Sequence, residues 1–198
     1  MLALFVGVCA AGRADTITTT FAGSDGSGGI SGGGWTFMFD LTVINPNGIR
    51  FNEFTVNVAQ SGEHTLDVYT RSSTYVGFEN NAAEWTFVST GASGPGSPAN
   101  GAVMIDVADF DLAPGTYGLA LVNTNYQAWI TFSGNNYGNS DVSIQTGAYA
   151  QGLFTGGSFA NRTWNGSINY EVIPEPTTGL LILFAAGLLL THPRQPKV

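Results

Sequence analysis

The stretch W-T-F-M-F-D-L-T-V-I, from Trp35 to Ile44, has the pattern that decides the fold. Large apolar residues alternate along it with smaller ones, which is typical of a β-strand. The stretch F-N-E-F-T-V-N-V, from Phe51 to Val58, has a similar period and carries Phe54, Val56 and Val58 on one face. These two stretches therefore predict long strands and an all-β fold.

Seven further short runs are rich in β-branched and aromatic residues, which favours strands. They are Leu66–Tyr69, Trp85–Val88, Val103–Val107, Tyr117–Val122, Trp129–Phe132, Val142–Ile144 and Ile168–Val172. Turn sequences rich in Gly, Pro and Asn separate the runs. About nine or ten strands with this spacing predict a sandwich or barrel, and the jelly-roll-like β-sandwich is the best-known shape of that size.

The composition of residues 15–173 limits what this domain can bind. The length suits one domain with its own core. Three arginines face thirteen acidic residues in this range, which leaves a net charge of −10. Phosphate binding needs clustered Lys and Arg, so we expect no nucleic-acid partner. The chain's single cysteine, Cys9, lies before the domain, so we expect no disulfide within it.

Residues 1–14, M-L-A-L-F-V-G-V-C-A-A-G-R-A, have the pattern of a signal peptide. Leu2–Ala11 is an apolar segment, and Gly12-Arg13-Ala14 places small residues three positions and one position before a cleavage site at Asp15. The basic segment that usually opens such a leader is missing, which leaves open a start upstream of Met1. We expect a signal peptide over residues 1–14, with a buried first strand as the alternative.

The last 25 residues, from Pro174 to Val198, combine three features. Pro174-Glu175-Pro176 predicts an exposed, extended elbow, because proline has a fixed φ and no backbone N–H. Thr177–Leu190 is uncharged and apolar on all sides, which predicts a helix in lipid or, alternatively, in a core. Its 14 residues span only about 21 Å, whereas a full membrane crossing needs roughly 20 residues.

Two positive charges follow the predicted helix. Arg194 and Lys197 lie on its C-terminal side alone, and positive charge marks the cytoplasmic flank of a membrane segment. We therefore expect residues 1–173 to lie outside the cytoplasm.

The tail resembles a PEP-CTERM sorting signal: a Pro-Glu-Pro motif, a short hydrophobic helix and a basic C-terminus. The match at Pro174, Glu175 and Pro176 is complete, but H-P-R-Q-P-K-V stands where the family has an Arg-rich cluster. The resemblance covers about 25 of the 198 residues. It implies recognition by a membrane-embedded exosortase, which removes the tail and releases or transfers the body to the cell surface or exterior. It therefore implies transient anchoring in the membrane.

The domain offers few groups for catalysis. Its single histidine, His64, is expected to be a satisfied surface residue, and one histidine cannot anchor the usual zinc site. Glu53 with Glu63, or Glu79 with Glu84, could supply the two carboxylates of a glycoside hydrolase. Nothing distinguishes these residues from solvated turn residues, so we expect no enzyme activity.

Calcium is the one cofactor that the sequence suggests. Asp106, Asp109 and Asp111 cluster next to a turn, and Ca²⁺ favours oxygen ligands from flexible loops. Asp25 and Asn135-Asn136 are further candidate ligands. The alternative is a polar strand end with no metal and no other cofactor.

Aromatic side chains are the candidates for contact with glycans, because aromatic faces pack against the apolar faces of sugars. Three of the four tryptophans lie in strand patterns and are expected in the core. These are Trp35, Trp85 and Trp129. Trp164 lies in the polar run Asn161–Gly166 and is the best candidate for an exposed ring. Tyr126 and Tyr137 flank similar Asn-rich loops.

Three functions follow from these patterns. The first is a non-enzymatic exported surface or extracellular-matrix protein associated with exopolysaccharide, a link that the family context implies. The second is a carbohydrate-binding module, which needs an exposed aromatic cluster with convergent polar side chains. The third is a small glycan hydrolase, which needs two carboxylates opposed in a cleft.

Overall fold

The computed structural model describes residues 12–21, 26–28, 35–124, 128–145 and 147–175. The predicted helix over residues 177–190 lies outside these ranges, and so do Pro176, Arg194 and Lys197. Most of the predicted leader and Tyr126 also lie outside them.

The described residues form fourteen β-strands and one short 3₁₀ helix, η1 (Ala82–Glu84). The strands are β1 (Arg13–Thr18), β2 (Gly26–Gly28), β3 (Trp35–Val43), β4 (Ile49–Val58), β5 (Thr65–Ser72), β6 (Thr86–Ala92), β7 (Gly101–Leu112), β8 (Gly115–Asn123), β9 (Ala128–Thr131), β10 (Tyr137–Gly138), β11 (Val142–Ile144), β12 (Gly147–Gln151), β13 (Ser158–Trp164) and β14 (Gly166–Val172). The all-β prediction is therefore confirmed.

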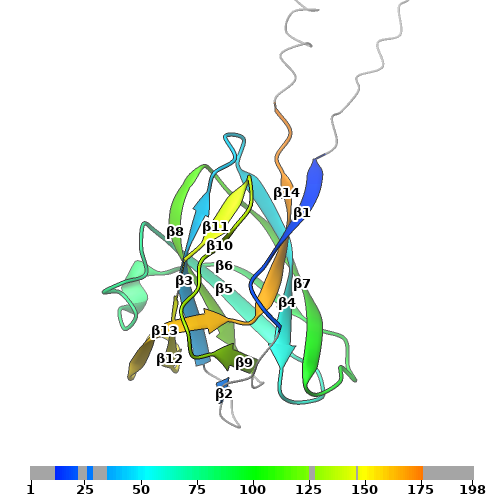
Figure 1. Ribbon diagram of the computed structural model, residues 1–198, viewed down its shortest axis with the longest axis vertical. Helices are drawn as coiled ribbons and strands as arrows, with labels where there is room; N and C mark the ends of the chain where they lie inside the picture. The colour runs from blue at the N-terminus through cyan, green and yellow to red at the C-terminus, as the bar shows by residue number, and fades with distance from the viewer. Residues whose placement is uncertain (1–11, 22–25, 29–34, 125–127, 146, 176–198) are drawn as a thin grey trace, which may run out of the picture.

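All strands belong to one antiparallel sheet in the order β1-β14-β4-β7-β6-β5-β8-β3-β12-β13-β9-β2. The hairpin of β10 and β11 attaches to β3. The sheet curves back on itself, so that Ala128 of β9 also pairs with Val58 of β4 (Figure 1). The described residues thus form more strands than the nine or ten expected. The additional strands are short or polar, as in β1, β10 and β13, and lack the alternation that reveals a strand.

The main core lies on the inner face of the curved sheet. Phe37, Phe39, Leu41 and Val43 of β3 are at most 3% exposed, and all four point inward because side chains alternate along a strand. Phe51 and Phe54 of β4 meet them from the other half of the sheet, fully buried. Burial of one such side chain stabilises the fold by about 1.5–3 kcal/mol.

A second apolar cluster covers part of the outer face. Met38 of β3 points outward and packs in a cluster with Trp85 and Phe154, whose rings stack with centroids 4.9 Å apart. The connection between β5 and β6 folds over this face, and Asp40 anchors it by accepting a hydrogen bond from the Tyr75 backbone N–H at 2.8 Å. Trp85 is thus buried as predicted, but in this second cluster.

The two described ends of the chain run side by side. β1 pairs with β14 from Arg13–Val172 to Thr18–Ser167, and both ends lie at the same pole of the molecule (Figure 1). The Ile173 N–H donates to the Gly48 carbonyl at 3.2 Å, and Pro174 and Glu175 beyond it are exposed.

Candidate functional site

An open groove of about 730 Å³ crosses the outer face of β1, β14, β4 and β7. The strand register places Thr16 opposite Asn169, Asn169 opposite Glu53, and Glu53 opposite Asp106, so these side chains form one polar row. Asp15 also lines the groove. The row combines carboxylates, an amide and a hydroxyl on rigid strands.

Hydrogen bonds order this row. The Thr16 hydroxyl donates to Asn169 Oδ1 at 2.5 Å, and Asn169 Nδ2 donates to Glu53 Oε1. Asn52 also lines the groove, and its buried Oδ1 has no hydrogen-bond partner among the described residues. Met104, 61% exposed, adds an apolar surface. Such a groove can accept hydrogen bonds from a hydroxylated ligand.

The carboxylate pairs considered for hydrolysis are arranged differently from the expectation. Glu53 has Asp106 as its cross-strand neighbour, whereas Glu63 lies exposed in the loop before β5 and does not line the groove. Glu84 in η1 lies 3.8 Å from the Arg71 guanidinium, as a half-exposed ion pair. Glu79 precedes η1 in the same connection. The structure therefore brings Glu53 to Asp106 rather than to Glu63.

Asp106, Asp109 and Asp111 do not converge as the calcium hypothesis requires. All three lie along β7, where five residues extend over about 16 Å. Asp111 instead accepts two hydrogen bonds from Arg50, at 2.7 and 3.0 Å, and this pairing holds the pKa of Asp111 below its usual value. The part of the chain that the structure describes contains no group of three His, Cys, Asp or Glu placed to hold a metal.

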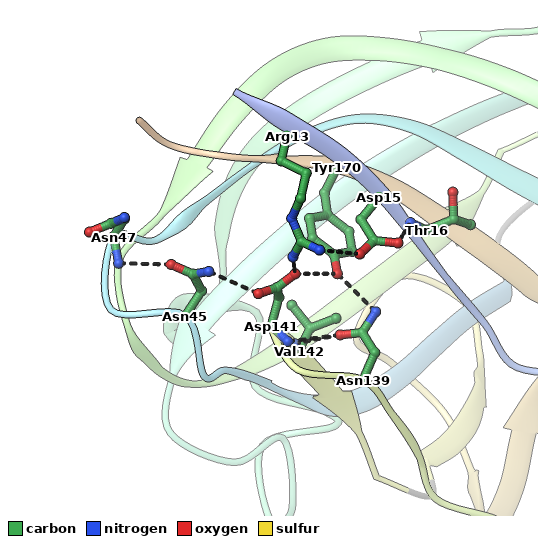
Figure 2. Close-up of polar contacts among 9 residues, drawn as sticks. All are labelled: Arg13, Asp15, Thr16, Asn45, Asn47, Asn139, Asp141, Val142 and Tyr170. Atoms are coloured by element: carbon green, nitrogen blue, oxygen red, sulfur yellow. Dashed lines mark hydrogen bonds and ion pairs between the residues drawn. The ribbon is translucent and has the colours of Figure 1, made fainter. Parts of the chain in front are cut away.

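A polar network joins β1 to the turn before β11 (Figure 2). Its centre is Asp141, 3% exposed, which accepts hydrogen bonds from the Arg13 guanidinium and from Asn45 Nδ2, the latter at 2.8 Å. The Tyr170 hydroxyl lies 3.4 Å from the same carboxylate and accepts from Asn139 Nδ2 at 2.8 Å. Burial, above all, raises the pKa of Tyr170 to about 12. The buried charge of Asp141 is thereby paired and hydrogen-bonded, as burial requires.

Arg13 therefore belongs to the folded domain in this structure, although the sequence pattern assigns it to the leader. β1 begins at Arg13, two residues before the expected domain start at Asp15. Its guanidinium bonds to Asp141 and lies 3.4 Å from the Asp15 carboxylate. Cleavage before Asp15 stays a prediction, and it would remove this partner of Asp141.

The expectation that Trp164 is exposed is wrong. Its ring is 4% exposed and lies in the main core, with centroids 5.9 Å from Phe39 and 6.3 Å from Phe54. It thus bridges the two halves of the sheet. Gly166 leaves space for the ring, because a Cβ at that position would lie 2.4 Å from Cζ2 of Trp164. The polar neighbours of Trp164 indicated a loop, but β13 extends through them.

Tyr137 lies close to Trp164, as a pair of glycan contacts would require, but without space for a sugar. Tyr137 is half-buried in β10 and packs against the main core. Together with Trp164, Asn135 and Arg162 it lines a cavity of about 10 Å³. That volume holds at most one water molecule. The third candidate, Tyr126, lies outside the described residues.

The other two predicted core tryptophans differ in burial, and His64 is buried rather than exposed. Trp35 is 7% exposed and stacks on Tyr149, whereas Trp129 in β9 is only half-buried. His64 is 1% exposed, so its expected surface position is wrong. Its backbone N–H donates to Ser93 Oγ at 3.0 Å, and burial lowers the pKa of its imidazole.

The sequence analysis missed three residues with large exposed rings or buried charge. Phe132 and Phe159 are 48% and 43% exposed, and Asp141 is the buried carboxylate described above. Phe132 ends the predicted strand Trp129–Phe132, whereas Phe159 and Asp141 lie in short polar runs that give no periodic signal. The exposure of the two rings and the burial of Asp141 therefore depend on strand pairing.

Comparison of the chain with protein-family models, with curated proteins and with solved structures finds no match in any of the three. Within the described residues, no helix has both the length and the apolar character needed to cross a membrane.

Proposed function

We propose that the chain is an exported, non-enzymatic protein of the cell surface or extracellular matrix, sorted through its C-terminal tail by an exosortase-type enzyme. The observation that carries the proposal is that Pro174 and Glu175, the first two residues of the Pro-Glu-Pro motif, come just after the last described strand. The Ile173 N–H still donates to the Gly48 carbonyl, whereas Pro174 and Glu175 after it are exposed. Cleavage at this elbow would leave all fourteen described strands intact.

Each part of the tail has a role in this proposal. The elbow gives the processing enzyme access, and the apolar segment over residues 177–190 brings that elbow to the membrane face. Arg194 and Lys197 hold the chain in place on the cytoplasmic side until it is processed. The mature body then lies in the envelope, at the surface or outside the cell.

The body in this proposal is a jelly-roll-like sandwich that associates with exopolysaccharide. A carbohydrate-binding module is the second candidate, and the polar groove across β1, β14, β4 and β7 favours it, because carboxylate and amide groups can bind sugar hydroxyls. A glycan hydrolase is the least favoured reading. The polar groove contains Glu53 but none of Glu63, Glu79 and Glu84, the other carboxylates of the two expected pairs.

Intact-mass analysis of the protein from a host with an exosortase tests the sorting proposal. We expect the surface or secreted form to end near Pro174, and Glu175→Gln to accumulate as a membrane-bound precursor. Glu171→Gln is the matched control, because it makes the same change four residues earlier, within β14, and should be processed normally. A mature protein that still ends at Val198 would contradict the proposal.

A second variant separates membrane engagement from processing. Replacing both Leu183 and Leu189 by Asp should abolish insertion, because each charge costs about 2.5–3.5 kcal/mol at the centre of a membrane helix. Fractionation of cells should then find the unprocessed chain outside the membrane. Normal processing of this double variant would show that the apolar segment is not needed.

A further inference from the structure

A row of aromatic rings leads from the buried part of the sheet to its surface. Trp35 of β3 stacks on Tyr149 of β12 with centroids 4.1 Å apart and an interplanar angle of 10°. Tyr149 in turn stacks on Phe159 of β13 at 5.5 Å and 26°. Exposure rises along the row, from 7% at Trp35 to 43% at Phe159. The face that holds the main core on β3 therefore reaches solvent on β13.

Arg162 lies beside this row on the same strand as Phe159. Its guanidinium carbon lies 4.6 Å from the ring centroid of Phe132, which is 48% exposed. Its positive charge also acts on the Tyr149 phenol, where it partly offsets the rise in pKa that burial causes. Arg162 Nη1 donates to the Ala160 and Asn161 carbonyls at 3.0 and 3.2 Å, which fixes one side of the guanidinium.

The charge of Arg162 is unusual for this protein. Among the four arginines in the described residues, Arg13, Arg50 and Arg71 each have a carboxylate within 4 Å. Arg162 forms no ion pair with a described carboxylate, although the domain carries a net charge of −10. Arginine binds carboxylates through a planar fork of donors and stacks on aromatic faces at the same time. Because Nη1 of Arg162 donates to two carbonyls and its Nε is buried, Nη2 is the donor left for a ligand with an acidic group.

We propose that Tyr149, Phe159 and Arg162 form a binding site for an acidic saccharide, a short chain of uronate sugars. The outer face of the Phe159 ring would stack on the apolar face of a sugar, with Tyr149 held behind it between Phe159 and Trp35, and the guanidinium would bind a carboxylate. Phe159 and Arg162 are three residues apart on β13, and the bulge at Asn161, which has a φ of 58° and no partner in the pairing with β12, lets both side chains face the same side of the sheet. Ser158 and Asn161 are exposed beside them and suit a hydroxylated ligand better than an apolar one.

The inference rests on the polysaccharide association in the proposed function and names the class of polymer. The opposing factor is the acidic charge of the domain, which repels an anionic ligand. At physiological ionic strength the Debye length is about 8 Å, so distant carboxylates are largely screened from the site. The local contact with Arg162 therefore determines whether the net electrostatic interaction with an anionic saccharide is attractive or repulsive.

Calorimetric titration of the full chain in mild detergent tests the site. A trimer of galacturonate is the probe, and a neutral galactose trimer is the reference ligand. We expect the galacturonate trimer to bind and the neutral trimer to bind at least about tenfold more weakly, since one charge-assisted hydrogen bond is lost. Arg162→Gln should weaken galacturonate binding at least about tenfold for the same reason. Phe159→Ala should weaken it about two- to tenfold, the size of one stacking contact.

Two matched controls remove the same groups elsewhere. Arg50→Gln removes the guanidinium that Asp111 already pairs, and Phe87→Ala removes a ring that is 51% exposed on β6. Both should bind the galacturonate trimer as the native chain does. Melting temperatures of all four variants, unchanged within a few degrees, would show that each variant is folded.

Three results would overturn the inference: no binding of galacturonate, equal binding of both trimers with Arg162→Gln unaffected, or equal losses in Arg50→Gln and Arg162→Gln. The titration uses purified chain, so it does not depend on export or on cleavage of the tail. A chain that is processed at the elbow but binds no galacturonate overturns this inference alone. A chain that binds it but still ends at Val198 overturns the sorting proposal alone.

Discussion

The inner face of the sheet differs between two ends of the molecule, one near β1 and β14 and the other near β12 and β13. At the end with β1 and β14, Tyr170 and Asp141 are buried, and their polar groups end in hydrogen bonds with Asn139, Asn45 and Arg13. At the end with β12 and β13, which lie away from the start of β1 in Figure 1, the rings of Tyr149 and Phe159 continue to the surface. The end that holds the chain termini is thus closed by polar pairing, whereas the other end offers rings for contact.

The largest effect should come from Trp164, which lies between the two ends. Trp164→Ala should lower the free energy of unfolding by about 3–5 kcal/mol, because it leaves a cavity between the halves of the sheet. Denaturant unfolding measures this loss. A loss below about 1 kcal/mol would show that the ring is not needed to join the halves. Trp164 would then again be a candidate for contact with glycans at the surface.

The polar end should respond less strongly. Asp141→Ala should cost about 1.5–3 kcal/mol in denaturant unfolding, the range for hydrogen bonds to a charged group, because it leaves Asn45 and Tyr170 without an acceptor. Arg13→Gln should cost less, since the Arg13 side chain is 59% exposed and is partly solvated already. Equal losses in the two variants would mean that the guanidinium, and not the buried carboxylate, closes this end.

The fold was predictable where burial produces a regular pattern. Trp35–Ile44 and Phe51–Val58 alternate because one of their faces meets the core, and they are β3 and β4 with boundaries that differ by a few residues. β10 and β13 were not predicted as strands, and β1 was considered only as an alternative to the leader. Their hydrogen bonds depend on partners distant in the sequence, and their polar side chains show no alternation.

The candidate sites were less predictable than the fold. Trp164 has polar neighbours on both sides, yet Thr163 and Asn165 are also buried, so local polarity did not report exposure. Asp141 follows the polar run Gly138-Asn-Ser140, where a buried carboxylate leaves no signal in the sequence. Phe159 and Arg162 form a surface only through the pairing of β13 with β12 and β9. Such sites depend on contacts between strands rather than on composition.

The pH dependence of stability should separate His64, which precedes β5, from Asp111 near the termini. Burial lowers the pKa of His64 in the folded state below the unfolded value of about 6.5, so the unfolded chain binds a proton first as pH falls. Stability is therefore full above about pH 6.5 and declines as pH falls below it. Asp111, near the termini, has a lowered pKa and loses its contribution only below about pH 4.

Melting temperatures at pH 7.5 and pH 5.5 measure the contribution of His64. The native chain should melt at a lower temperature at pH 5.5, and His64→Gln should remove most of that difference. An unchanged difference in His64→Gln would place the titrating group elsewhere.

The smallest effect should come from Phe159, at the exposed end of the aromatic row. Phe159→Ala should cost less than about 1 kcal/mol, because the ring is 43% exposed and loses mainly its stacking on Tyr149. Phe37→Ala is the matched control, since Phe37 lies opposite Tyr149 on β3, is 1% exposed and should cost about 3–5 kcal/mol. The two rings flank the same tyrosine, so their difference in denaturant unfolding measures what burial alone contributes. A loss above about 2 kcal/mol for Phe159 would make that ring part of the core, and the two ends of the sheet would then be closed to a similar degree. A small loss instead means that the fold does not require an exposed ring at position 159. This is expected of a residue whose ring serves ligand binding rather than stability.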